Sequence, residues 1–103
     1  MNTQSQTAVL EDVQTKTRYA PRWQVIGIND DVTSMEYVML LLIDIFHKSQ
    51  EDAFRLMMKV HETGAAPFYF GTREACELKV EQVQTMNKTY EENLMVSLEV
   101  VDE

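Results

Sequence analysis

The stretch INDDVTSME, residues 28–36, lies between a short apolar run and a longer one. Asn and Asp favour turns because their side chains hydrogen-bond to nearby backbone groups. The polar residues 29–31 therefore end the run WQVIGI, residues 23–28, which has the β-branched and aromatic content of a strand. Thr33 followed by Glu36 is a capping-box pattern, which predicts the start of a helix. The stretch marks a change from strand to helix.

Apolar residues cover well over half of the circumference of this predicted helix. They are Met35, Val38, Met39, Leu41, Leu42, Ile45 and Phe46. A helix that packs against a single core needs only one apolar stripe. We therefore expect part of this surface to face something other than the core.

Two more helices are predicted further along the chain. Ser49 and Asp52 repeat the capping pattern, and Gly64 is placed to terminate the helix that they begin. Thr72 is placed to cap the third helix. The predicted packing faces are Ala53, Phe54, Met57, Val60 and His61 in the second helix, and Cys76, Val80, Val83, Asn87 and Tyr90 in the third.

The remaining strands complete the predicted fold. Residues 67–70 form a short strand whose initial Pro67 favours an edge position, and residues 94–101, LMVSLEVV, form the last strand. The order β-α-α-β-α-β predicts an α+β fold, in which a small, mainly antiparallel three-stranded sheet packs with three helices. We expect residues 1–21, rich in Thr and Gln, to be a flexible N-terminal tail, and residues 22–103 to be one core domain.

Charge and composition narrow the class of partner. Nine Lys and Arg residues against seventeen Asp and Glu give a net charge of −8, the wrong sign for binding nucleic acid or an anionic membrane surface. The longest strongly apolar run, residues 38–43, is too short to cross a bilayer. Cys76 is the only cysteine, so neither an internal disulfide nor a spaced Cys/His metal cluster is expected. We expect a cytoplasmic protein without a metal or cofactor.

Two kinds of chemistry are open to the polar residues. An enzyme would pair His61 with Asp30 or Asp31, but the chain has no recognisable nucleophile motif and no Gly-rich phosphate loop. A binding site requires less, because oxygens from Asn29 and Asp31 together with a neutral His61 suit a small cation such as an ammonium group. Each residue alone is also typical of a turn or a helix end. The residues themselves therefore predict a candidate pocket and leave its ligand open.

Three linked motifs resemble the ClpS adaptor family. They are N-D-D-x-T-x-M-E at 29–36, L-M-x-x-V-H-x-x-G at 56–64 and T-x-E-x-x-E-x-K-V at 72–80, within a resemblance that covers residues 22–99. The resemblance implies a non-enzymatic adaptor that captures N-degron proteins, those with an N-terminal Phe, Tyr, Trp or Leu. Such an adaptor delivers them to a Clp AAA+ unfoldase of the ClpA or ClpC type, whose N-terminal domain it contacts. The alternative is an interaction domain of the same fold that has lost N-degron recognition.

The resemblance also implies roles for individual residues. The substrate α-amino group would be bound by Asn29, Asp31 and His61, with Asp30 beside them. The pocket for the first substrate side chain would comprise Thr33, Met35, Val38, Met57, Val60 and Leu94, with Met35 excluding side chains branched at Cβ. Glu74 and Lys79 would contact the unfoldase. Ser34, Tyr69 and Asn93 depart from the residues common in the family, which leaves the substrate preference open.

Overall fold

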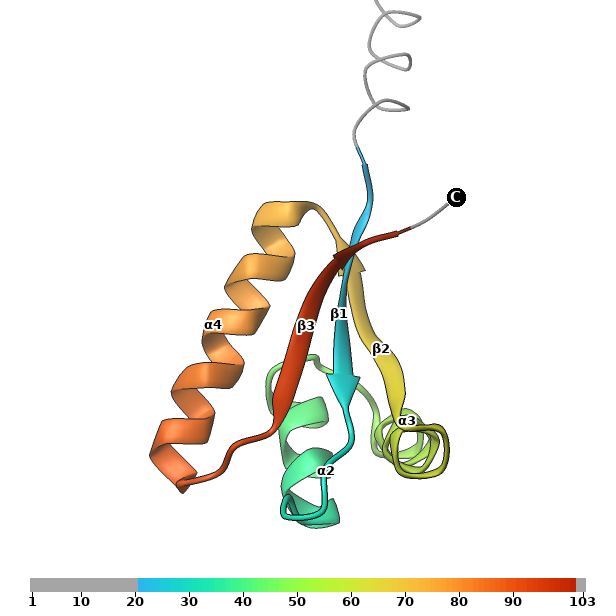
Figure 1. Ribbon diagram of the computed structural model, residues 1–103, viewed down its shortest axis with the longest axis vertical. Helices are drawn as coiled ribbons and strands as arrows, with labels where there is room; N and C mark the ends of the chain where they lie inside the picture. The colour runs from blue at the N-terminus through green and yellow to red at the C-terminus, as the bar shows by residue number, and fades with distance from the viewer. Residues whose placement is uncertain (1–20, 102–103) are drawn as a thin grey trace, which may run out of the picture.

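The computed structural model describes residues 21–101 of the chain. Its elements are β1 (Trp23–Ile28), α2 (Met35–Asp44), α3 (Gln50–Thr63), β2 (Ala65–Gly71), α4 (Arg73–Tyr90) and β3 (Met95–Val100). Both β2 and β3 pair antiparallel with the central β1. In Figure 1, α4 runs alongside the sheet, and α2 and α3 lie near the end of β1. The predicted α+β architecture and element order are confirmed. A flexible tail is predicted for residues 1–21, of which residues 1–20 lie outside the described residues.

The centre of the core is a contact between β1 and β2. The pairing of β1 with β2 shifts register between Val25 and Ile26, so that Phe68 is the extra residue of a bulge. Phe68 is fully buried, and a Cβ added to Gly27 would lie 2.0 Å from the Cζ atom of its ring. Glycine is therefore required at position 27 because the ring crosses the strand there. The short edge strand predicted at 67–70 is confirmed at the sheet edge and is longer than expected.

The first helix is capped by Ser34 and not by Thr33, so the predicted capping box is wrong. The Ser34 side chain accepts a hydrogen bond from the Tyr37 N–H at 3.1 Å. Thr33 is unavailable as a cap because its hydroxyl and its N–H both donate to the Asp30 carboxylate. The helix therefore begins one residue later than the capping pattern indicated.

The caps predicted for the other two helices are confirmed. Ser49 accepts from the Asp52 N–H, and Thr72 accepts from the Ala75 N–H, each at 3.1 Å. Gly64 ends α3 in the left-handed conformation, with a φ of 96°, which glycine adopts without the steric cost that a Cβ adds.

The predicted packing faces of α3 and α4 need three corrections. Phe54 is 56% exposed, Tyr90 is 54% exposed and His61 is also exposed, so none of the three belongs to the core. In α4 the buried positions are Cys76, Val83 and Met86. These buried positions, which include Met86 in place of Tyr90, form the side of α4 that packs against the sheet.

Helix α4 also fixes α2 through two hydrogen bonds. The Tyr37 hydroxyl, near the start of α2, donates to Asn87 Oδ1 at 2.6 Å. The Lys79 ammonium donates to the carbonyl oxygen of Ile45, the C-cap residue of α2, also at 2.6 Å. Because α2 carries residues that line the pocket described below, α4 helps to set the position of one pocket wall.

Within residues 21–101, no helix combines the length and apolar character needed to span a bilayer. The same part of the chain holds no group of three or more His, Cys, Asp or Glu side chains arranged for a metal ion.

Candidate binding pocket

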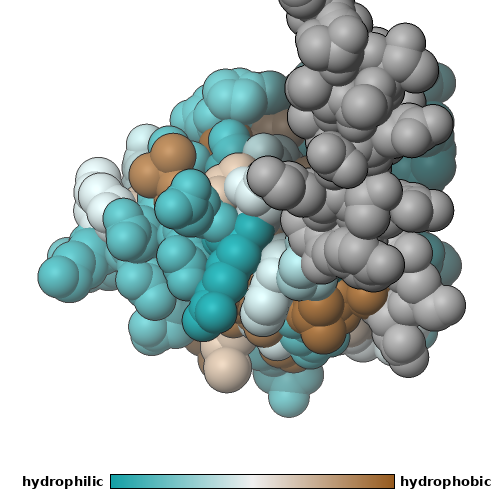
Figure 2. All heavy atoms as spheres, turned by 90° about the horizontal axis from the view of Figure 1, so that it is seen from above, coloured by the Kyte–Doolittle hydropathy of each residue, from teal (hydrophilic) through white to brown (hydrophobic). Residues whose placement is uncertain are grey.

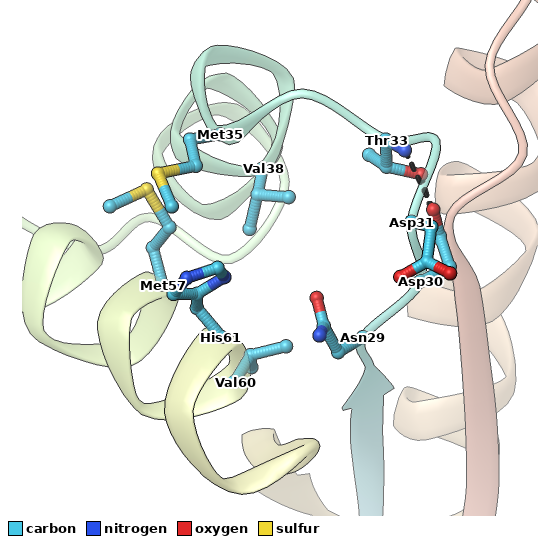
Figure 3. Close-up of a pocket in the computed structure, with 9 residues that line it drawn as sticks. All are labelled: Asn29, Asp30, Asp31, Thr33, Met35, Val38, Met57, Val60 and His61. Carbon is cyan, nitrogen blue, oxygen red and sulfur yellow. Dashed lines mark hydrogen bonds between the residues drawn. The ribbon is translucent and has the colours of Figure 1, made fainter.

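A cavity of about 260 Å³ lies between the loop after β1 and the facing sides of α2 and α3. Figure 3 shows the side chains around it. Its lining residues are Asn29, Asp30, Asp31, Thr33, Met35, Val38, Met57, Val60 and His61. The cavity therefore lies between the polar loop and the part of the apolar surface of α2 that the sequence predicts to face something other than the core.

Helical spacing produces the apolar wall. Met35 and Val38 are three residues apart on α2, and Met57 and Val60 have the same spacing on α3, so each pair lies on one side of its helix. Val38, Met57 and Val60 are buried, whereas Met35 is 41% exposed. The two methionine side chains lie next to each other in Figure 3. The cavity therefore has a buried apolar interior and, at its rim, an unbranched methionine whose side chain has several rotatable bonds.

The polar wall depends on a backbone contact between two distant segments. The Asn29 N–H donates to the carbonyl oxygen of Gly64 at 2.9 Å, which joins the end of β1 to the end of α3. This contact sets His61, on the last turn of α3, across the cavity from Asn29. Figure 3 shows the Asn29 amide extending into the cavity, with His61 on one side and the two aspartates on the other.

The two aspartates differ in their surroundings. Asp30 Oδ1 accepts from the Val32 N–H at 2.8 Å and from the Thr33 N–H at 2.6 Å, and Asp30 Oδ2 accepts from the Thr33 hydroxyl at 2.7 Å. Burial opposes ionisation of Asp30, but these three donors outweigh it and lower the pKa of the carboxyl from its ordinary value. Asp31 is exposed, and no donor within residues 21–101 hydrogen-bonds to its carboxylate.

This arrangement suits a ligand with two adjoining parts. Asn29, Asp31 and His61 supply an amide oxygen, a carboxylate and an imidazole nitrogen, which are acceptors suited to an ammonium group. The buried interior beside them suits one large apolar side chain. The cavity is therefore complementary to an ammonium group that lies next to a bulky apolar group.

The structure brings together nine of the ten residues predicted for the two parts of the pocket. The exception is Leu94, which is 3% exposed in the core and does not line the cavity. Its carbonyl oxygen accepts from Asn87 Nδ2 at 3.0 Å, which fixes the backbone before β3. Leu94 thus lies in the core and outside the cavity lining, and its role as a pocket wall stays a prediction.

The two predicted unfoldase contacts lie in different environments on α4. Glu74 is exposed in the first turn of the helix. Lys79 is partly buried: its ammonium donates to the Ile45 carbonyl and lies 5.4 Å from the centre of the Tyr69 ring. Lys79 is thus not an ordinary solvated surface residue.

The family model described as ATP-dependent Clp protease adaptor protein ClpS matches residues 18–97. This chain belongs to the ClpS family. The ATP-dependent Clp protease adapter protein ClpS of Phenylobacterium zucineum is 36% identical over 93 residues, which cover 90% of this chain and 85% of that protein. The protein of the same name from Xylella fastidiosa is 34% identical over 95 residues, 92% of this chain and 90% of that relative.

A solved structure supports the same membership. It is Agrobacterium tumefaciens ClpS2 bound to L-phenylalaninamide, with a TM-score of 0.75 and 28% sequence identity. The match covers 80% of this chain and 99% of that chain. The protein is thus an adaptor of the Clp protease by family, and the ClpS family is one of adaptors and not of proteases.

Proposed function

We propose that this ClpS-family adaptor binds proteins through their N-terminal residue when that residue is Phe, Tyr, Trp or Leu, and delivers them to a Clp AAA+ unfoldase. The observation that carries the proposal is the junction of the Asn29, Asp31 and His61 acceptors with a buried apolar cavity. A protein N-terminus with a bulky first residue has the complementary chemistry, since its ammonium group and its first side chain are attached to the same carbon. The ligand named for Agrobacterium tumefaciens ClpS2, L-phenylalaninamide, shares this chemistry.

The two parts of the ligand would use separate parts of the pocket. Its α-ammonium group donates to Asn29, Asp31 and His61, and each hydrogen bond to a charged group contributes about 1.5–3 kcal/mol. Its first side chain enters between Val38, Met57 and Val60, which contributes about 1.5–3 kcal/mol on burial. After the costs of association, these contributions are consistent with a Kd of about 1 μM. Neither part alone supplies that affinity.

Selectivity follows from the same chemistry. An acetylated N-terminus has no charge and fewer donors, so its binding would desolvate Asn29 and Asp31 without compensation. Met35, at the rim, disfavours first residues branched at Cβ, because their additional methyl group would lie against its side chain. The proposed substrates are therefore bulky, unbranched at Cβ and free at the N-terminus.

The proposed partner is the N-terminal domain of a ClpA-type or ClpC-type unfoldase, bound at the first half of α4, which includes Glu74 and Lys79. Glu74 is exposed there. In the view from above, on the side where α4 begins, the visible surface of the described residues is mostly hydrophilic with separate hydrophobic patches (Figure 2). A surface of this kind suits a reversible contact with polar and charged groups. Such a contact leaves the pocket, at the other end of β1, free for substrate.

A degradation assay tests delivery. A folded reporter with an N-terminal Phe is incubated with a ClpA-type or ClpC-type unfoldase, its peptidase and ATP, with and without the adaptor. We expect the adaptor to accelerate loss of the Phe reporter and not of a matched reporter that begins with Gly. Asp31→Ala is the control for recognition. Equal acceleration of both reporters would contradict the proposal and favour an interaction domain without N-degron recognition.

A further inference from the structure

The loop that carries the polar wall is fixed to both neighbouring helices. At its start, the Asn29 N–H donates to Gly64 at the end of α3. At its end, Thr33 directly precedes Ser34, the N-cap of α2. Asp30 connects these ends, because its carboxylate accepts from two backbone N–H groups and one hydroxyl of residues 32 and 33. The Asp30 carboxylate thus holds the loop in one conformation between the two helices.

The three donors leave Asp30 poorly suited to bind a further cation. Figure 3 shows the hydroxyl of Thr33 turned towards the aspartates, and both oxygens of Asp30 are engaged with residues 32 and 33. A carboxylate offers about four acceptor positions, and three are occupied here. Asp31 differs, because no donor within residues 21–101 engages it and it is exposed at the cavity. The two neighbouring aspartates are therefore equipped for different tasks.

We propose that Asp30 is a positioning residue, whose carboxylate holds the loop so that Asn29 and Asp31 face the cavity, and that Asp31 supplies the charge that binds the ligand. This inference rests on the proposed function, since the ligand of the loop is taken to be an α-ammonium group. Asp30 lines the same cavity as Asp31, but its effect on binding is indirect. It lowers the conformational freedom that the loop would lose when the ligand binds.

Asparagine and alanine at position 30 separate the two roles. Asp30→Asn removes the charge but keeps one oxygen that accepts from the N–H groups of Val32 and Thr33. Its amide nitrogen replaces the second oxygen and donates to the Thr33 hydroxyl. Asp30→Ala removes all three contacts. Asp31→Asn is the matched control, since it makes the same chemical change at the adjacent position. A residue that binds the ammonium by its charge should respond to Asn, whereas a positioning residue should respond mainly to Ala.

The first readout is the Kd for a peptide that begins with Phe, measured by isothermal titration calorimetry at pH 7. We expect Asp30→Asn to stay within about threefold of wild type, because asparagine also forms this kind of turn. We expect Asp30→Ala to weaken binding by about tenfold or more, as is common for residues that orient a ligand-binding group. Asp31→Asn should also weaken it by about tenfold or more. Equal losses in Asp30→Asn and Asp31→Asn, or no loss in Asp30→Ala, would overturn the inference.

The second readout needs no ligand. Hydrogen exchange of the amides of residues 32 and 33, measured by NMR on the full chain, should be slow in wild type and in Asp30→Asn, and fast in Asp30→Ala. Fast exchange in wild type would overturn the inference whatever the binding results. Failure of the wild-type protein to bind the Phe peptide, with slow exchange at these amides, would instead overturn the proposed function while the loop geometry stands. The two failures are thus distinguishable.

Discussion

The ammonium of Lys79 on α4 lies 2.6 Å from the carbonyl oxygen of Ile45, the residue that ends α2. The last carbonyl groups of a helix have no partner within the helix, and a lysine side chain can satisfy one of them. The same ammonium lies 5.9 Å from the centre of the Phe46 ring. Lys79 therefore joins two helices, one of which forms a wall of the pocket.

Lys79→Met should reduce the stability of the fold. The substitution keeps much of the apolar stem but removes the donor to Ile45, so we expect the free energy of unfolding to fall by about 1–2 kcal/mol, at the lower end for a charged donor because the site is partly exposed. Urea denaturation measures the change. Lys59→Met, an exposed lysine on α3, is the control and should change the free energy by less than about 0.5 kcal/mol. Equal stability of the two variants would show that the hydrogen bond from Lys79 to Ile45 does not stabilise the fold.

The hydrogen bonds to Asp30 predict an acid-dependent contribution to stability. Its pKa is lower in the folded protein than the value of about 3.9 that is usual in an unfolded chain, so the folded state favours the ionised form. The resulting stabilisation is present above about pH 3.9 and is lost as the pH falls through the lower folded value. We expect wild type to be more stable than Asp30→Asn at pH 7 and this difference to shrink below pH 4. Urea denaturation from pH 7 to pH 3 measures the difference in stability. A difference that grows in acid would contradict a stabilising role for the ionised Asp30 carboxylate.

Met35→Ala should widen the specificity of the pocket. Met35 is half-exposed at the rim, and its removal gives space for a methyl group on Cβ of the ligand. We expect the affinity for peptides that begin with Ile or Val to rise about tenfold relative to Phe peptides, which corresponds to about 1.4 kcal/mol. Fluorescence anisotropy with labelled peptides measures the ratio. Met58→Ala, a partly buried methionine on α3 that does not line the cavity, is the matched control. An unchanged ratio would remove Met35 from the specificity determinants.

His61 should contribute to ammonium binding as an acceptor. Its imidazole lies across the cavity from the Asn29 amide (Figure 3). His61→Phe keeps an aromatic ring but removes the acceptor, so we expect the Kd for a Phe peptide to rise about tenfold or more. Calorimetric titration at pH 7 measures the change. An unchanged Kd would exclude His61 as an acceptor.

Local chemistry made most of the fold predictable. The strand at residues 23–28 and the caps Ser49, Gly64 and Thr72 follow from patterns of a few neighbouring residues, and the structure confirms them. The start of α2 was missed because Thr33 and Ser34 are both good caps. The choice depends on Asp30, which takes up the hydroxyl and N–H of Thr33. An Asp three residues before a Thr is a sequence signal for this turn.

Long-range contacts were less predictable. The meeting of Asn29 with His61 depends on a backbone hydrogen bond to Gly64. The residue types alone make the two side chains candidates for one cation site, whereas their assignment to a substrate α-amino group comes from the resemblance to ClpS proteins. The burial of Leu94 and the bond of Lys79 to Ile45 depend on how α4 packs, which no local pattern encodes. The exposed position of Tyr90 has the same origin, whereas that of Phe54 depends on how α3 packs against α2 and β2.

The proposed ligand of the pocket is a free N-terminus together with its first side chain. The most direct measurement is calorimetric titration with two peptides of the same sequence that begin with Phe, one free and one acetylated at the N-terminus. We predict a Kd of about 1 μM for the free peptide and binding at least about a hundredfold weaker for its acetylated form, since the ammonium contacts are lost. Equal affinities for the two peptides, or no binding of either, would contradict this proposal.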